Sequence, residues 1–161
     1  MPETTAAPAA QPGNWVDPLR AYNFKLLING VTEGHFTEVT GLGVRVERIS
    51  YREGGSNAVV RAIPGRVTYA AVTLRFGLTS SQELWDWLMS AVEGRVTRRN
   101  VSVVMLDASG SAEVLRWNLI NAWPQEWYGA PLDAQSQSLA IETLVLAHEG
   151  LHRETGNGVA A

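Results

Sequence analysis

The sequence contains no cysteine, which excludes disulfide bonds and thiolate metal sites and fits folding in a reducing compartment. No apolar run approaches the roughly 20 residues that a membrane-spanning helix needs. Positive charge is not in excess, since the net charge is -3, so the basic footprint of a nucleic-acid-binding protein is missing. Residues 1–13 contain no Lys or Arg and do not match the pattern of a signal peptide. We therefore expect synthesis and folding in the cytoplasm, with any export through a dedicated machine.

What the sequence does contain is enough apolar material for one core. Its 161 residues are 45% hydrophobic, and a chain of this length is by default one domain. The Ala-, Pro- and Thr-rich start and the Gly-rich end have the composition of flexible tails. The predicted organisation is a tail over 1–14, a single domain over 15–153 and a second tail over 154–161.

Alternating apolar residues predict strands along most of the domain. The run 22–28 alternates, and Asn29-Gly30 after it is a strong hairpin signal. Further strands are predicted over 31–39, 44–51, 69–76, 101–106, 113–121 and 139–147. The dipeptide Trp123-Pro124 is expected to end the strand before it. Many strands and one helix predict a mainly β fold, a barrel or sandwich with one packed α-helix.

The helix is predicted at about residues 80–93. Ser80 to Glu83 match a capping box, in which Ser80 is the N-cap and the Glu83 carboxylate reaches back to its amide. Trp85 and Trp87 cannot point the same way, so one of them is expected to anchor the core. The side chains expected to pack on the barrel are Leu84, Trp85, Leu88, Ala91 and Val92. Those expected to point outward are Gln82, Asp86 and Glu93.

A long predicted connection runs from Tyr51 to Gly65 and contains no His, no Cys and no paired carboxylates. A connection of this length in a small domain usually has a function. Its charged and apolar side chains include Arg52, Glu53, Arg61, Val59, Val60 and Ile63. This composition predicts docking against another protein surface rather than chemistry.

The sequence His148-Glu149-Gly150-Leu151-His152 matches the H-E-x-x-H zinc pattern, in which two histidines one helical turn apart bind the metal and the glutamate activates water. That mechanism needs a helix, which Gly150 weakens, and residues 139–147 alternate as a strand does. A third ligand is also needed; Glu154 lies nearby, and His35 is the only other histidine. A strand end followed by a turn is the favoured interpretation.

Six tryptophans are many for this length. Trp117, Trp123 and Trp127 cluster around a predicted loop, where an aromatic platform for sugars is one alternative. Packing in a core or an interface is favoured, because aromatic rings dominate both. The predicted core anchors are Phe24, Leu84, Trp85, Leu88, Trp117 and Trp123.

Seven stretches, in order and with consistent spacing between Asp17 and Arg153, give the chain a resemblance to a known family. They are Asp17-Pro18-Leu19-Arg20 with Tyr22-Asn23-Phe24; Phe36-Thr37-Glu38-Val39-Thr40-Gly41-Leu42; Tyr51-Arg52-Glu53-Gly54-Gly55; Ile63-Pro64-Gly65; Glu83-Leu84-Trp85-Asp86-Trp87; Trp117-Asn118 with Asn121-Ala122-Trp123-Pro124; and Ile141-Glu142 with Leu146-Ala147-His148-Glu149-Gly150. On these residues the chain resembles the tail-tube (inner tube) proteins of contractile-tailed phages and phage-tail-like contractile injection systems.

The resemblance implies a structural role, with no catalysis, cofactor or metal. It implies a barrel of two antiparallel sheets with one helix, related to the phage tail tube and the type VI secretion ring protein. In this family six subunits close into a ring, and rings stack into a hollow tube inside a contractile sheath. A spike tips the tube, which contraction drives through a target envelope. The second histidine of the zinc-like motif is not part of the family's shared pattern.

The implied partners are further copies of the chain, the sheath protein, baseplate and spike proteins, a terminator or cap protein, and an effector protein or DNA in the lumen, with no direct membrane anchor. The implied location is the bacterial cytoplasm, and then an injection particle or phage tail that is released or attached to the envelope. A closed ring needs two different faces that meet head to tail, and strand edges suit that contact. We expect the sheath on the outward side of the helix.

The Tyr51 to Gly65 connection is expected to cross the seam between rings. The residues expected at ring and subunit interfaces are Arg52, Glu53, Gly54, Gly55, Asn57, Val59, Val60, Arg61, Ile63 and Arg66. The lumen should be lined by small and polar side chains, and the candidates are Thr73, Arg75 and Ser102.

Three classes of function are compared: a tube subunit, a zinc peptidase or other small hydrolase, and a carbohydrate-binding β-sandwich. Rings or tubes under the electron microscope support the first, and stoichiometric zinc the second. Retention on a glycan column that is lost on replacing Trp123 or Trp127 supports the third. Within the first class, a tube initiator at the baseplate and a type VI secretion ring protein are close alternatives, and the sequence does not distinguish DNA from protein cargo.

Overall fold

The computed structural model describes residues 22–29, 31–32, 36–52, 54–55, 60–78 and 82–156. Its elements in chain order are β1 (Phe24–Ile28), β2 (Val31–Thr32), β3 (Phe36–Thr40), β4 (Val44–Arg52), β5 (Val60–Tyr69), β6 (Val72–Gly77), α1 (Glu83–Val92), β7 (Arg99–Leu106), β8 (Glu113–Tyr128), β9 (Ile141–Ala147) and β10 (Gly150–Thr155). Every strand pair is antiparallel, so the predicted fold class, mainly β with one helix, is confirmed. The tail expected over 1–14 lies outside the described residues.

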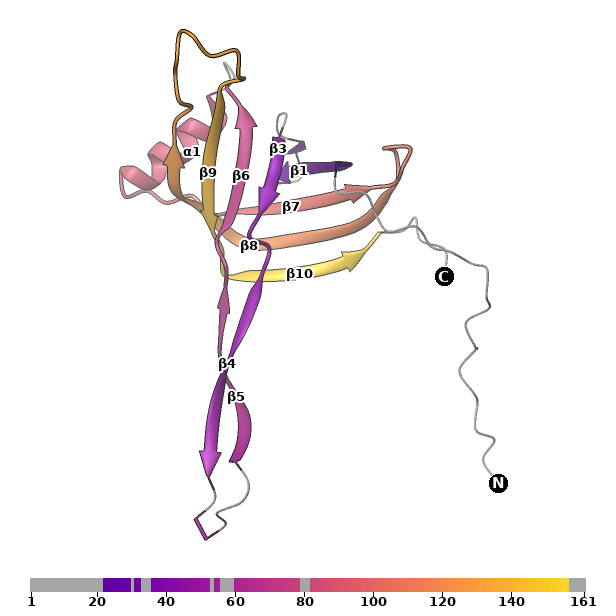
Figure 1. Ribbon diagram of the computed structural model, residues 1–161, viewed down its shortest axis with the longest axis vertical. Helices are drawn as coiled ribbons and strands as arrows, with labels where there is room; N and C mark the ends of the chain where they lie inside the picture. The colour runs from indigo at the N-terminus through magenta and orange to yellow at the C-terminus, as the bar shows by residue number, and fades with distance from the viewer. Residues whose placement is uncertain are drawn as a thin grey trace, which may run out of the picture.

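The strands follow the order β2-β1-β7-β8-β9-β6-β3, with β10 also paired to β8. β8 joins two layers, because its first half pairs with β7 and β10 and its second half with β9. Asn121, at a φ of 51°, and a register shift between Pro124 and Glu126 mark the change of direction. In Figure 1 the strands of the first layer, β1, β7, β10 and the first half of β8, run horizontally. The strands of the second layer, β9, β6 and β3, run vertically. The two layers are thus parts of one eight-stranded sheet that bends at β8 to form a sandwich, whereas the sequence predicted a barrel or sandwich of two sheets.

The core lies between these layers and beneath α1. Cross-strand pairs such as Leu26 with Val103 and Ile28 with Val101 supply one side. Leu74 paired with Leu144 supplies part of the other. These side chains are almost wholly removed from water, and burying each contributes roughly 1.5–3 kcal/mol. The period-2 patterns that predicted the strands are therefore the patterns of the core faces.

The helix differs from its prediction at its start and on its buried face. It begins at Glu83, with Gln82 as N-cap and no side-chain cap bond, so the capping-box prediction is wrong; Ser80 lies outside the described residues. Trp87, 1% exposed, is the buried tryptophan, whereas Trp85 is 43% exposed and packs edge-on against Trp127 with ring centroids 4.9 Å apart. Choosing Trp85 as a core anchor was wrong.

The other predicted core anchors are buried to different extents. Leu88 is buried, and Leu84 and Trp117 are partly buried and pack against the core. Phe24 and Trp123 are only partly buried. Val92, expected to pack, is 68% exposed.

Three strand predictions need correction. The long connection is mostly a hairpin, because β4 continues to Arg52 and β5 starts at Val60. β8 runs through Trp123-Pro124 to Tyr128 instead of ending there. The strand expected over 31–39 is divided, and its second part, β3, pairs with β6. β4 and β5 extend because they pair with each other, whereas the limits of β8 and β3 depend on partners farther away in sequence, β9 and β6.

Candidate assembly interface

The β4–β5 hairpin forms a sheet of its own, and Figure 1 shows it projecting from the lower end of the sandwich. Its strands pair from Val44 with Tyr69 to Arg52 with Val60. A two-stranded hairpin is at best marginally stable alone in water, so a projecting one normally needs contacts with a partner. The geometry therefore marks it as an interaction element.

Seven large apolar side chains of the hairpin are exposed to between 44% and 57%; they are Val44, Val46, Ile49, Tyr51, Val60, Ile63 and Val67. All residues of β4, and all of β5 except Gly65 and Tyr69, are exposed. Soluble monomers rarely expose contiguous apolar patches of this kind unless another molecule covers them. The sequence pattern predicted a strand over 44–51 and a docking connection over 51–65, and the structure leaves nearly all residues of β4 and β5 exposed to water.

A register shift between Val46 and Arg48 divides the hairpin into two parts. Near the sandwich Val46 pairs with Val67, and toward the tip Ile49 pairs with Ile63. Because these β4 residues are three apart in an alternating strand, the two apolar pairs lie on opposite faces. Both faces of the hairpin therefore offer apolar area to a partner.

The hairpin is also strongly basic. Residues 44–69 contain five arginines and two glutamates, against a net charge of -3 for the chain. Arg45, Arg48, Arg52 and Arg66 form no ion pair within the described part of the chain. Unpaired, exposed arginines suit planar, bidentate binding of carboxylates.

Most of the predicted interface residues lie on this hairpin. Those described are Arg52, Gly54, Gly55, Val60, Arg61, Ile63 and Arg66. Glu53, Asn57 and Val59 fall outside the described residues. The apolar residues of β4 were not among the predicted interface residues, although the sequence contained a signal for them. Arg45 interrupts one alternating set of side chains in 44–52 and Arg48 the other, so neither face of this strand has the pattern of a continuous core face.

The zinc-like motif lies at a strand end followed by a turn, as the favoured interpretation predicted, and a further strand that was not predicted, β10, starts within it. β9 ends at Ala147 and β10 begins at Gly150. His148 Nδ1 lies 2.9 Å from the Gly150 carbonyl oxygen and Nε2 2.8 Å from that of Ala70, so both ring nitrogens face backbone oxygens. His152 is exposed on β10, and within the described residues no three His, Cys, Asp or Glu side chains group to hold a metal.

Glu149 within that motif has a structural role. Its carboxylate accepts a hydrogen bond from Asn121 Nδ2 at 2.9 Å and pairs with Arg98. The Asn121 hydrogen bond and the Arg98 charge lower the pKa of Glu149. These contacts hold the turn beside the bend of β8, so the glutamate is not free to activate water.

The lumen candidates fall on two different layers. Thr73 and Arg75 lie on β6, where Arg75 forms an ion pair with Glu38 at 3.1 Å. Ser102 lies on β7 and donates a hydrogen bond to Asn118 Oδ1 at 2.7 Å. The structure therefore does not bring the three residues together on one surface.

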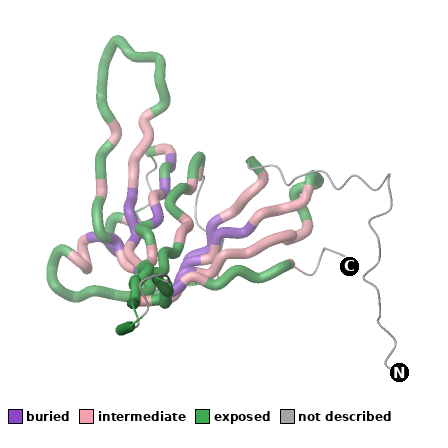
Figure 2. The backbone as a smooth tube through the Cα atoms, turned by 60° about the horizontal axis from the view of Figure 1, so that its bottom comes forward, coloured by how far each residue is buried: buried purple, intermediate pink, exposed green. Residues whose placement is uncertain are grey.

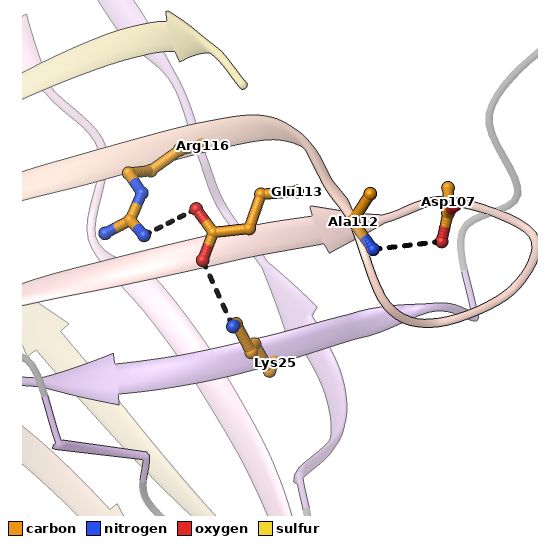
Figure 3. A network of polar contacts seen from close by, with 5 residues as sticks. All are labelled: Lys25, Asp107, Ala112, Glu113 and Arg116. Atoms are coloured by element: carbon orange, nitrogen blue, oxygen red, sulfur yellow. Dashed lines mark hydrogen bonds and ion pairs between the residues drawn. The ribbon is translucent and has the colours of Figure 1, made fainter. Parts of the chain in front are cut away.

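The layer that carries Ser102 also holds an ion network, drawn in Figure 3. Glu113 binds Arg116 at 2.6 Å and Lys25 at 3.1 Å, and the hydrogen bonds from these two cations lower its pKa. In the adjoining turn, hydrogen bonds from the Ser109 hydroxyl and the Ala112 amide lower the pKa of Asp107. The network fixes the β7–β8 corner and leaves this surface polar with paired charges.

The one helix of the described residues, ten residues long, is too short to cross a membrane.

Comparisons with known proteins agree with this geometry. Residues 20–152 match the family described as T4-like virus tail tube protein gp19. A chain of the PVC sheath-tube complex, an extracellular contractile injection system in its extended state, is 25% identical with a TM-score of 0.78, over 86% of this chain and 92% of that one. A chain of the PVC sheath/tube terminator is also 25% identical, with a TM-score of 0.80 over 87% and 99% of the two chains.

A more distant likeness extends to Hcp1 from Flavobacterium johnsoniae, which is 15% identical with a TM-score of 0.52 over 83% of this chain and 95% of that chain. At this identity the likeness shows a shared fold. None of the curated proteins shows significant similarity to the chain.

Proposed function

The chain belongs to the T4-like virus tail tube protein family, whose members are structural and not enzymes, and we propose that it is an inner-tube subunit of a phage-tail-like contractile injection system. Six copies close into a ring, and rings stack into a tube whose lumen holds cargo. The sheath surrounds the tube, and baseplate, spike and terminator proteins lie at the ends of the tube. The particle is extracellular, as the PVC contractile injection system is.

The observation that carries this proposal is the projecting β4–β5 hairpin. It is too thin to bury a core, and its apolar pairs are exposed on both faces. An element of this kind gains stability only when neighbouring molecules cover it. A stack of rings supplies that cover, since each hairpin can reach across a seam into the next ring.

Ring closure is proposed to use strand edges. β3 pairs only with β6, and the second half of β8 pairs only with β9, so each leaves a row of backbone groups free on its other side in the described structure. Such edges readily add a strand from another chain. Two unlike edges on one subunit meet head to tail, as a closed ring requires.

The outward side of α1 is the proposed sheath side. Glu83 and Asp86 are exposed there, and neither forms an ion pair with a described Lys or Arg.

The lumen wall is proposed to be the outer face of one layer, either that of Thr73 and Arg75 or that of Ser102. Cysteine variants at Thr73, Ser102 and Asp86, made in a cysteine-free background, test this in assembled tubes. A thiol-reactive label too large to enter the lumen should leave the cysteine on the lumen wall unmodified and should react with the cysteine of Asp86→Cys.

Electron microscopy of the purified full-length chain tests the proposal itself. Rings and tubes are expected at high concentration or with sheath and baseplate partners. Gly54→Trp should shorten the tubes without unfolding the subunit, because nothing lies within 4 Å of a Cβ built there. Gln82→Trp at the exposed start of α1 is the control. A chain that stayed monomeric with its partners present would refute the tube assignment, and full-length tubes from Gly54→Trp would refute the seam assignment.

A further inference from the structure

A second exposed surface lies at the end of the molecule opposite the hairpin (Figure 1). It consists of the segment 129–140 with the adjoining ends of β6, β8 and β9, and we call it the upper rim. The Leu78 amide donates a hydrogen bond to the Ala140 carbonyl oxygen at 2.9 Å, which ties the segment to β6. Backbone amides of Gln135 and Ser136 bond Asp133, which gives the segment a fixed turn.

The upper rim exposes large apolar side chains. Leu132 and Leu139 are 83% and 84% exposed, and Leu78 and Tyr128 are 56% and 57% exposed. Figure 2 shows the rim segment exposed over most of its length. Leucines this exposed contribute nothing to the subunit's own core. Their exposure indicates that another molecule covers them.

The rim is acidic where the hairpin is basic. Glu126, Asp133 and Glu142 lie on it, and residues 117–152 contain no Lys or Arg. None of these three carboxylates forms an ion pair with a described cation. Glu126 instead accepts a hydrogen bond from the Tyr128 hydroxyl at 2.8 Å, which raises the pKa of that tyrosine. Its carboxylate is thus held at the surface.

From these two surfaces we propose that the hairpin of one copy docks on the upper rim of the next copy. The proposal rests on the tube function and names the receiving site of the ring-to-ring contact. Apolar side chains of the hairpin cover the exposed leucines, and its unpaired arginines meet the unpaired carboxylates. Because the two patches differ and lie at opposite ends, the contact is heterologous and repeats without limit along one axis. Matching charges fix which end of a ring accepts the next.

Charge reversal tests the pairing. Arg48→Glu with Arg66→Glu should leave rings intact and reduce stacked rings about tenfold or more, because like charges then face each other. Asp133→Lys with Glu142→Lys should do the same. Mixing the two variant preparations should restore tubes of alternating rings, since every seam then joins opposite charges. The matched controls are Arg153→Glu and Glu154→Lys, which reverse exposed charges on β10 and should stack normally.

The rescue separates the pairing from damage to the fold, because misfolded variants cannot restore one another. Leu132→Ser with Leu139→Ser supplies a second test; it removes apolar area that the subunit does not bury and should weaken stacking while leaving the melting temperature of the ring unchanged. If the unaltered chain forms neither rings nor tubes, the tube function fails. If it forms tubes, and both reversed variants stack normally or their mixture stays unstacked, the tube function stands and the rim pairing is overturned.

Discussion

Replacing Trp87 by Ala should destabilise the subunit far more than replacing Trp85 two residues earlier. Trp87 is 1% exposed, its Nε1 donates a hydrogen bond to the Thr97 carbonyl oxygen at 2.6 Å, and the Arg99 guanidinium lies 5.2 Å from its ring centroid. Truncating a buried tryptophan costs about 3–5 kcal/mol. The carbonyl oxygen left without its donor adds roughly 1 kcal/mol. The expected loss is therefore about 4 kcal/mol or more, a large part of the 5–15 kcal/mol that stabilises a typical domain.

Trp85→Ala removes a side chain that is 43% exposed and whose ring contact is the edge-on one with Trp127. That contact is worth about 0.5–1.5 kcal/mol, so the variant should lose roughly 1–2 kcal/mol. Urea unfolding followed by far-UV circular dichroism measures both losses, at one protein concentration because assembly shifts apparent stability. Trp87→Phe should fall between the two, since it keeps ring burial and removes the donor. Equal losses for Trp85→Ala and Trp87→Ala would refute the assignment of the buried ring.

Four further substitutions have definite expected outcomes. Gly41→Ala should lower the free energy of unfolding by about 2 kcal/mol or more in thermal melts, because Gly41 has a φ of +89° and a Cβ there would stand 2.2 Å from the Ala71 carbonyl oxygen; an unchanged melt would contradict this. Glu113→Gln should cost less than about 1 kcal/mol at neutral pH. Arg116 and Lys25 lower the pKa of Glu113 in the folded state. Their stabilisation of the fold is therefore present above the ordinary glutamate pKa and is lost as the pH falls through the lowered value. Urea titrations at several pH values should find that the stability of Glu113→Gln depends less on acid pH than that of the unaltered chain. His152→Ala should change the free energy of unfolding by less than about 0.5 kcal/mol. His148→Ala should lower it by about 1–2 kcal/mol, because both ring nitrogens of His148 lie within hydrogen-bond distance of backbone oxygens. Stoichiometric zinc binding by the unaltered chain that is lost in His152→Ala would contradict the absence of a metal site.

Local patterns predicted much of the fold because each strand of the sandwich buries one face. The run 22–28 corresponds to β1, and β1 pairs with β2 as the hairpin signal predicted; Gly30 of that signal lies outside the described residues. Residues 72, 74 and 76 alternate with Thr73 and Arg75 and fill the core, as expected. The turn between β9 and β10 was also predicted, because a glycine between the two histidines disfavours the helix that a zinc site would need.

Strand limits and the choice of buried tryptophan could not be predicted in this way. Trp85 and Trp87 both fit a helix, and only the position of α1 against β8 decides which ring enters the core. Trp123-Pro124 looks like a strand end, yet β8 continues, because β9 pairs with its second half around a register shift. The apolar residues of β4 alternate as those of a core strand do, and locally only the interrupting Arg45 and Arg48 set them apart; that both faces lie in water is decided by the tertiary structure.

The sequence by itself determined the fold class, the family and the structural role, since these follow from apolar periodicity and ordered motifs along the chain. Only the tertiary structure decided where the exposed surfaces that we propose for assembly lie. It placed the basic hairpin and the acidic rim at opposite ends of one axis, and it separated Ser102 from Thr73 and Arg75 by assigning them to different layers. The physical reason is that a surface is made of residues distant in sequence, and their adjacency depends on strand pairing that no local segment encodes.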